Sequence, residues 1–464
     1  MAKAGARALH PTLLREYDIR GIVGKTLTAE DARAIGLAFG SILARDGGRT
    51  VVVGYDGRIE SPDLERALVQ GLTATGMSVT RIGLGPTPMI YFAAHDMASD
   101  GSVMVTGSHN PPEYNGFKFS HRGKPFYGAD IQNLGRVAAE GAFASGRGET
   151  RDRNVLDAYV ARLARDHRGT RELAVAWDPG NGAAGDALAR LVRKLPGRHT
   201  VINGAIDGRF PAHHPDPTVE KNLAQLKAAV TGGGCDLGFA FDGDADRIGM
   251  VDGRGRVLWG DQILVLLAGE VLKDEPGATI IADVKASQVF FDEIARLGGR
   301  PLMWKTGHSL IKAKMQELKA PLAGEMSGHI FFRHRFYGVD DALYAAVRLL
   351  SVVASGDMSL AELRDALPAM VNTPEIRFDC AEDRKFRVVE EVQRRLKTAP
   401  GLAVDDVDGV RVTTADGWWL LRASNTQAVL VARCESRNAE GLARLKAALA
   451  EQLTLSRVAI PDLG

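Results

Sequence analysis

The sequence predicts an α/β protein in which three related α/β units precede a smaller α+β unit. Helical and strand-like hydrophobic periods alternate through the first three quarters of the chain, as they do in layered α/β folds. A weak internal repeat supports this prediction. In each of three segments an apolar run reaches an Asp near its carboxyl end: VVVGYDGR (51–58), LAVAWDPGNGAAG (173–185) and TIIADVKAS (279–287). Beyond residue 409 the pattern changes to alternating apolar and polar residues.

The first unit shows the expected order of elements. Thr28 and Asp31 form an approximate capping box, which predicts a helix running to about Arg45. Residues 51–53 are three valines that indicate a buried strand, and helical spacing returns from Leu64. In the last unit, residues 409–436 predict antiparallel strands and residues 439–453 a closing helix.

Polar or glycine- and proline-rich stretches indicate where the units meet. These are SGRGETRD (145–152), VDGRGRV (251–257) and residues 368–374. We therefore expect domains over residues 1–152, 153–256, 257–368 and 369–464.

Composition limits the classes of partner. The 464 residues include 58 basic and 57 acidic side chains, so a net charge of +1 leaves no global field for nucleic acid or membrane. Three widely spaced cysteines argue against a disulfide framework or a clustered zinc site. Arg7, His10 and Arg15 stand where a signal peptide needs its apolar core, and the longest apolar run, 263–269, is too short to span a bilayer. We expect a cytoplasmic monomer whose partners are small molecules.

The stretch TGSHNPPEYNGFK (106–118) places Ser108 between a glycine and a histidine, ahead of two prolines that forbid helix. An ordinary surface turn uses the same residue types. The alternative is a stiff loop that presents an exposed serine hydroxyl for chemistry.

Three carboxylates alternate in GFAFDGDADR (238–247), just after an apolar strand. Crowding Asp242, Asp244 and Asp246 is costly unless a cation offsets their charge. An EF-hand is excluded, because Arg247 occupies the position of its turn glycine and Gly253 that of its bidentate Glu. Magnesium with an open coordination position fits best. A solvated acidic turn, or a phosphatase with Asp242 as nucleophile, is the alternative.

Two glycine motifs resemble nucleotide-binding loops. GIVGKT (21–26) lacks the first P-loop glycine, whose position Ile19 occupies, and no strand precedes it. GNGAAG (180–185) matches GxGxxG between a strand and a helix, but no acidic residue suited to a ribose follows at the next strand end. A tight turn explains its glycines equally well.

Taken with GEMSGH (324–329) and RASNT (422–426), the serine and acidic loops resemble the α-D-phosphohexomutases in sequence and order. The resemblance covers essentially the whole chain and is closest to the bacterial phosphomannomutase/phosphoglucomutase branch. It implies four domains around a central cleft. It also implies a phosphoserine at Ser108 that acts on mannose and glucose phosphates through a hexose 1,6-bisphosphate, with Mg²⁺ held by the three aspartates and a phosphoserine oxygen.

Further roles follow from the same resemblance. Lys118 and Arg247 would neutralise charge on the transferred group, although each could instead form a structural ion pair. A hydroxyl proton would pass to His109, His308 or His329, with His329 ranked first because it lies in the sugar loop. Other cleft residues would hold the sugar or the phosphate that is not transferred: Glu325, Ser327 and His329; Arg422, Ser424, Asn425 and Thr426; and Tyr17, Arg20 and Lys285.

Two other functions stay open at this point. One is phosphoglucosamine mutase, whose serine and sugar loops usually differ from those here. The other is a catalytically silent phosphosugar-binding relative, in which we expect the serine or an aspartate to be lost.

Overall fold

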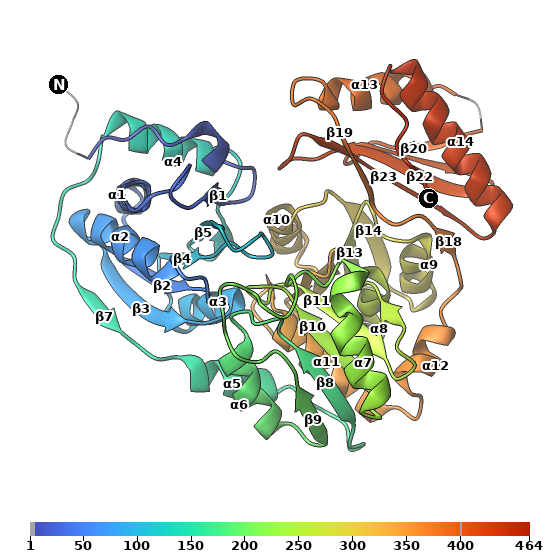
Figure 1. The fold of residues 1–464 in the computed structure, drawn as a ribbon, viewed down its shortest axis with the longest axis horizontal. Helices are drawn as coiled ribbons and strands as arrows, with labels where there is room; N and C mark the ends of the chain where they lie inside the picture. The colour runs from blue at the N-terminus through green and yellow to red at the C-terminus, as the bar shows by residue number, and fades with distance from the viewer. Residues whose placement is uncertain (1–4, 400) are drawn as a thin grey trace.

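The computed structural model describes residues 5–399 and 401–464, which form four β-sheets with their surrounding helices (Figure 1). The first three sheets share one arrangement. In each, the first strand of the unit lies between the second and third and is parallel to both, and the fourth and fifth strands follow antiparallel. The strands of these units are β2–β6, β8–β12 and β13–β17. The predicted class, three related α/β units and a smaller α+β unit, is confirmed.

The first sheet has the order β1-β5-β4-β2-β3-β7, with β6 paired to β5. Its strands are β1 (Ile19–Ile22), β2 (Thr50–Tyr55), β3 (Ser78–Leu84), β4 (Gly101–Val105), β5 (Tyr114–His121), β6 (Lys124–Pro125) and β7 (Thr150–Asp152). The helices are α1 (Ala29–Arg45), α2 (Ser61–Ala74), α3 (Thr87–Asp96) and α4 (Ala129–Glu140).

The predicted cap of α1 is confirmed. The Thr28 hydroxyl accepts a hydrogen bond from the Asp31 N–H at 3.3 Å, and the Asp31 carboxylate accepts one from the Thr28 N–H at 2.9 Å. Helix α2 begins at Ser61, before the expected Leu64, because its first turn tolerates Pro62. Part of the expected first linker is instead strand β7, which pairs in parallel with β3.

The second sheet has the order β12-β11-β10-β8-β9. Its strands are β8 (Ala174–Asp178), β9 (Arg198–Val201), β10 (Leu237–Phe241), β11 (Ile248–Asp252) and β12 (Val257–Leu258), and its helices are α5 (Leu156–Ala164), α6 (Gly185–Leu191) and α7 (Ala224–Gly232). The expected linker 251–257 forms the hairpin between β11 and β12. The Asp252 carboxylate accepts the N–H groups of Arg254 and Arg256, both at 2.9 Å, and fixes this turn. We therefore propose that the second domain ends after Leu258.

The third sheet has the order β14-β13-β15-β16-β17. Its strands are β13 (Thr279–Asp283), β14 (Arg300–Trp304), β15 (Leu322–Gly324), β16 (Ile330–Phe332) and β17 (Val339–Asp340). The helices are α8 (Gly260–Asp274), α9 (Gln288–Arg296), α10 (His308–Leu318), α11 (Ala342–Ser355) and α12 (Leu360–Asp365).

The fourth sheet is antiparallel, with the order β18-β23-β22-β21-β20 and β19 paired to β23. Its strands are β18 (Val371–Asn372), β19 (Ile376–Asp379), β20 (Ala403–Asp405), β21 (Val410–Thr414), β22 (Gly417–Ala423) and β23 (Val429–Ser436). Helices α13 (Lys385–Leu396) and α14 (Ala439–Leu455) complete it. The predicted strands and closing helix are thus confirmed.

The domains are joined by packing as well as by the chain. One buried apolar cluster runs from α3 through the second sheet to α8 and α11, so the first three domains share a core. The fourth domain docks through Arg411, whose guanidinium donates to the carbonyls of Val284 and Ala286 at 2.7 and 2.8 Å and lies 3.7 Å from the centre of the Trp418 ring. This contact holds the fourth domain against the loop that follows β13.

Candidate active site

A cleft of about 860 Å³ is lined by residues from all four domains. Most of the predicted site residues lie on its walls: Tyr17, Arg20, Ser108, His109, Lys118, Arg247, Lys285, His308, Glu325, Ser327, His329, Arg422, Ser424, Asn425 and Thr426. The three predicted metal ligands are buried directly behind Ser108. The fold therefore brings the separate motifs into one place.

The serine loop between β4 and β5 is fixed by two residues that the sequence analysis missed. Arg58 donates hydrogen bonds to four loop carbonyls, and Asp56 accepts from the Thr106 hydroxyl at 2.8 Å and the Gly107 N–H at 3.1 Å. The four carbonyls are those of Ser108, Asn110, Pro111 and Tyr114, at 2.6 to 2.9 Å. Ser108 itself has φ +49°, a strained conformation for a residue other than glycine.

The expected exposed position of Ser108 was wrong, since the residue is only 3% exposed. Its Oγ lies 3.1 Å from Asp242 Oδ2, to which it donates, and 3.2 Å from His109 Nδ1. Burial, and then the charges of Arg247 and Arg20, lower the pKa of His109 well below its usual value. A neutral imidazole therefore stands beside the hydroxyl at pH 7.

The acidic loop between β10 and β11 forms a concentrated negative site. Asp242, Asp244 and Asp246 are fully buried, with carboxylate oxygens within 4.8 Å of one another. Burial and the other two carboxylates raise the pKa of Asp242. Oδ1 of Asp244 and Oδ1 of Asp246 have no hydrogen-bond partner among the described residues. Such orphaned buried oxygens suit a hard divalent cation.

Lys118 connects the first domain to this loop. Its Nζ donates to Asp244 Oδ2 at 2.7 Å and also contacts Asp246 Oδ2. Although burial opposes the charge, the two carboxylates raise the pKa of Lys118 well above its usual value. This lysine is therefore a permanent cation between the serine and acidic loops.

The glycines of the GxGxxG motif support the acidic loop. A Cβ on Gly182 would lie 2.8 Å from the Gly243 carbonyl oxygen, and the Ala183 N–H donates to that same oxygen at 2.9 Å. The close approach of the two backbones explains Gly182. The tight turn is also present, since Gly180 has φ +54° and the Gly182 N–H donates to the Pro179 carbonyl at 2.7 Å.

A chain of polar contacts runs through His329. Its Nε2 accepts from Arg247 Nε at 2.9 Å, so in the neutral ring the proton is on Nδ1. That nitrogen faces Asp340 Oδ2 at 3.0 Å, and Asp340 Oδ1 accepts from Lys312 Nζ at 3.0 Å. Asp340 and Lys312 were not predicted. His308 lies next to this chain, its ring 5.5 Å from that of His329, and burial and Lys312 lower its pKa.

The sugar loop between β15 and β16 is held by Glu325 and by the Met326 N–H, which donates to Asp283 Oδ1 at 3.1 Å. Glu325 Oε1 accepts from the Gly307 N–H at 2.7 Å, ahead of α10. Lys285 Nζ lies 2.9 Å from Glu375 Oε2 and 3.6 Å from Asp283 Oδ2. Burial raises the pKa of Asp283 to about 6. Glu375, from the start of the fourth domain, was not predicted.

The loop between β22 and β23 lines the cleft. Arg422 Nε donates to Asp408 Oδ2 at 3.0 Å, which leaves other guanidinium N–H groups toward the cleft. The Ser424 hydroxyl accepts from the Thr426 and Gln427 N–H groups at 3.3 and 3.2 Å. The Arg422 guanidinium and the Ser424 hydroxyl are donor groups of the kind that bind phosphate.

Two predicted residues near the start of the first domain also line the cleft. Tyr17 donates to the Thr306 carbonyl at 2.8 Å and accepts from Asn425 Nδ2 at 2.7 Å, so it links three domains. Arg20 donates to the Gly107 carbonyl at 2.6 Å and contacts Asn110 Oδ1. Arg20 therefore also stabilises the serine loop.

This fold and site are those of a class of four-domain enzymes. Models of the phosphoglucomutase/phosphomannomutase family match the α/β/α domains I, II and III at residues 11–144, 157–255 and 259–371, and its C-terminal domain at 375–452. The chain belongs to the phosphoglucomutase/phosphomannomutase family.

Individual relatives agree with this assignment. The chain is 42% identical to a phosphomannomutase/phosphoglucomutase of Pseudomonas aeruginosa over 99% of each sequence. It is 40% identical to a phosphoglucomutase of Neisseria gonorrhoeae, over 94% of this chain and 95% of that one. A crystal structure of a family protein from Burkholderia thailandensis superposes with a TM-score of 0.92 at 42% identity, covering 98% of this chain and 99% of that one.

No helix in residues 5–399 or 401–464 is both long and apolar enough to cross a membrane.

Proposed function

We propose that this enzyme is an isomerase that interconverts hexose 1-phosphates and hexose 6-phosphates, with mannose and glucose as its sugars. The observation that carries the proposal is the position of Ser108 Oγ, 3.1 Å from a carboxylate of the acidic loop and inside a cleft that Arg422 and Ser424 also line. Guanidinium and hydroxyl groups are donors of a kind suited to a second phosphate. The names of the full-length relatives support the same reaction class.

In the proposed reaction, phosphorylated Ser108 transfers its phosphoryl group to a free hydroxyl of the bound sugar monophosphate. The bond between phosphorus and Ser108 Oγ breaks, a bond from phosphorus to the sugar oxygen forms, and the hydroxyl proton passes to a base. The product is a hexose 1,6-bisphosphate, which turns over in the cleft and returns its other phosphoryl group to Ser108. The stiff loop favours this step, because phosphoryl transfer depends mostly on positioning and charge stabilisation.

Asp242, Asp244 and Asp246, together with a phosphoserine oxygen, would hold Mg²⁺. When bound, the ion would neutralise charge on the transferred phosphoryl group. Lys118 and Arg247 add fixed positive charge beside it. His329 is the base we favour, because it lies in the sugar loop and its Nδ1 faces Asp340, which would stabilise the protonated ring. To take the proton, Nε2 would exchange its hydrogen bond from Arg247 for one from the sugar hydroxyl.

The remaining cleft residues would bind the parts of the substrate that do not react. Arg422, Ser424, Asn425 and Thr426 would hold the phosphate that is not transferred. Glu325 and Ser327 would hold sugar hydroxyls, with Lys285 beside them.

The test is the substitution Ser108→Ala, measured as conversion of glucose 1-phosphate to glucose 6-phosphate by ³¹P NMR. We expect a loss of at least about 10³-fold in turnover, because the substitution removes the hydroxyl that would carry the phosphoryl group. Ser145→Ala, at an exposed serine outside the cleft, is the matched control and should leave turnover unchanged. Peptide mass mapping should find one phosphate on Ser108 in the enzyme that carries no substitution. Normal turnover by Ser108→Ala would refute the phosphoserine mechanism.

A further inference from the structure

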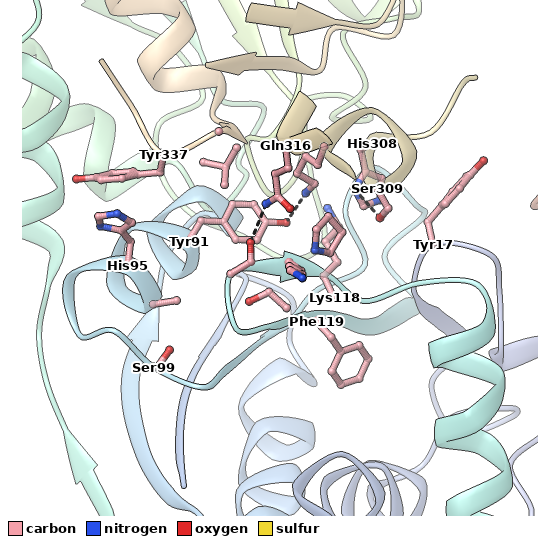
Figure 2. Close-up of a pocket in the computed structure, with 18 residues that line it drawn as sticks. Tyr17, Tyr91, His95, Ser99, Lys118, Phe119, His308, Ser309, Gln316 and Tyr337 are labelled. Carbon is pink, nitrogen blue, oxygen red and sulfur yellow. Dashed lines mark hydrogen bonds between the residues drawn. The ribbon is translucent and has the colours of Figure 1, made fainter. Parts of the chain in front are cut away.

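A second cavity lies between the first and third domains, next to the cleft (Figure 2). It is formed by α3, β5, β6 and α10 together with residues 337–339, and we call it the rear pocket. Its volume is about 130 Å³. Tyr17, Lys118 and His308 line both the rear pocket and the cleft, so the two cavities adjoin at these three side chains.

The charge of the rear pocket has one sign. None of the described residues that line it is Asp or Glu. Three lysines line it: Lys118, Lys124 and Lys312. Lys124 makes no ion pair with any described residue. Lys312 uses two of its three N–H groups, for Asp340 and the Tyr91 hydroxyl, and Lys118 uses two for its carboxylate partners. Each of these two buried lysines retains one N–H, which suits an anion.

The body of the pocket suits a flat ring. Tyr91 and Tyr337 contribute aromatic surface, and His95 lies with its ring centre 4.2 Å from that of Tyr337 (Figure 2). Burial raises the pKa of Tyr91 to about 12, so this phenol stays neutral. A cavity of about 150 Å³ is known to accommodate benzene. The rear pocket is therefore close to the size of a single six-membered ring.

We propose that the rear pocket binds a small aromatic carboxylate, and that its occupancy lowers turnover. The ring would lie among Tyr91, His95 and Tyr337, and the carboxylate would take the lysine N–H groups. The coupling to the cleft is geometric. Lys118 and His308 line both cavities, and Lys312 donates to the same Asp340 that faces His329 at 3.0 Å. An anion in the rear pocket that attracts Lys118 and Lys312 would displace Lys118 in the cleft and, through Asp340, His329.

Binding is tested on the full-length enzyme with 4-fluorobenzoate, followed by ¹⁹F NMR, with 4-fluorobenzamide as a neutral probe of the same shape. We expect saturable binding of the carboxylate with a dissociation constant of about 1 mM or below, and at least about tenfold weaker binding of the amide. Saturating glucose 1-phosphate should not displace the probe. Absence of saturable binding, equal binding of the amide, or displacement by the sugar phosphate would each overturn the proposal.

Three variants, at residues that do not line the cleft, locate the site. Ala94→Trp fills the rear pocket and should abolish probe binding. Lys124→Gln removes one exposed charge and should weaken binding by about two- to fivefold, which also covers the case in which the tryptophan variant does not fold. Lys25→Gln removes an exposed lysine elsewhere on the first domain and should change nothing. Unchanged binding by Lys124→Gln would place the probe elsewhere.

The effect on turnover is measured separately, with glucose 1-phosphate as the substrate. We expect 4-fluorobenzoate to lower kcat and leave KM nearly unchanged, and Ala94→Trp to be insensitive to it. Binding to the rear pocket with no change in kcat would refute the coupling. An increase in KM alone would indicate competition in the cleft and overturn the proposal.

Discussion

Replacing Lys118 with methionine should destabilise the enzyme strongly, and added Mg²⁺ should restore much of the loss. Lys118 is 6% exposed, and its two carboxylate partners, Asp244 and Asp246, are fully buried. Removing one partner from a buried ion pair costs about 3 to 5 kcal/mol, because it leaves an uncompensated charge. Because the first three domains share a core, the cooperative unit is about 370 residues, for which this corresponds to a fall in Tm of about 4 to 6 °C.

The assay is thermal unfolding in chelator and in excess Mg²⁺, for the unmodified enzyme and for Lys118→Met. A divalent cation on the acidic loop supplies the missing positive charge, so Mg²⁺ should raise the Tm of the variant more than that of the unmodified enzyme. Lys25→Met, an exposed lysine on the same domain, controls for loss of a charge as such. An equal Tm for the variant and the control in chelator would refute the reasoning. So would the same Mg²⁺ response in the variant and the unmodified enzyme, since the metal and the lysine would then not share the carboxylates.

Three further outcomes are expected. Arg422→Lys loses the bidentate contact to Asp408 and would lose the one to a bound phosphate. The KM for glucose 1-phosphate should therefore rise by about one to two powers of ten. An unaltered KM would show that Arg422 has a structural role only. Burial raises the pKa of Asp341 to about 7 while its N-cap contact to Tyr344 remains available to Asn. The folded state therefore binds a proton that the unfolded state loses near pH 4, and stability falls as the pH rises toward 7. The advantage of Asp341→Asn in urea unfolding should accordingly grow by about 2 to 3 kcal/mol from pH 5 to pH 8, and no growth would contradict this. Finally, kcat/KM for glucose and mannose 1-phosphates should agree within about a hundredfold, and a ratio above about 10⁴ would show a site that reads the C2 hydroxyl.

The residues whose place in the candidate site could be predicted from the sequence are those whose chemical character is visible in a short segment. The alternating aspartates of residues 242–246 crowd their charges within one turn, and the serine loop is stiffened by its own prolines. The helix cap at Thr28 is likewise a contact over three residues. Local chemistry was therefore sufficient for these features.

The residues that were missed act across long sequence separations. Arg58 holds the carbonyl of Ser108, 50 positions away, although its own segment, VVVGYDGR, had been recognised as part of the internal repeat. Asp340 reaches Lys312, 28 positions away, and Asp408 reaches Arg422 from another turn. Nothing in the neighbouring sequence marks these partners. Residues 251–257 were expected to be a linker but form a hairpin. Here local composition was insufficient, because a glycine-rich hairpin and a glycine-rich linker have the same composition.

The related units explain why the separate motifs meet. In each of the first three domains, the functional loop follows the third strand of the unit and leads into the fourth: β4 to β5 for Ser108, β10 to β11 for Asp242, and β15 to β16 for Glu325. Ligands bind at the carboxyl ends of parallel strands, and the equivalent loops of three such units converge here on one cleft. They also touch directly, since Ser108 donates to Asp242 and the backbone of Arg247 bridges to that of His329. Because each loop contacts the next, displacing one must alter the geometry of its neighbour, so the phosphoryl donor, the acidic loop and the sugar loop should respond to substitution as one unit.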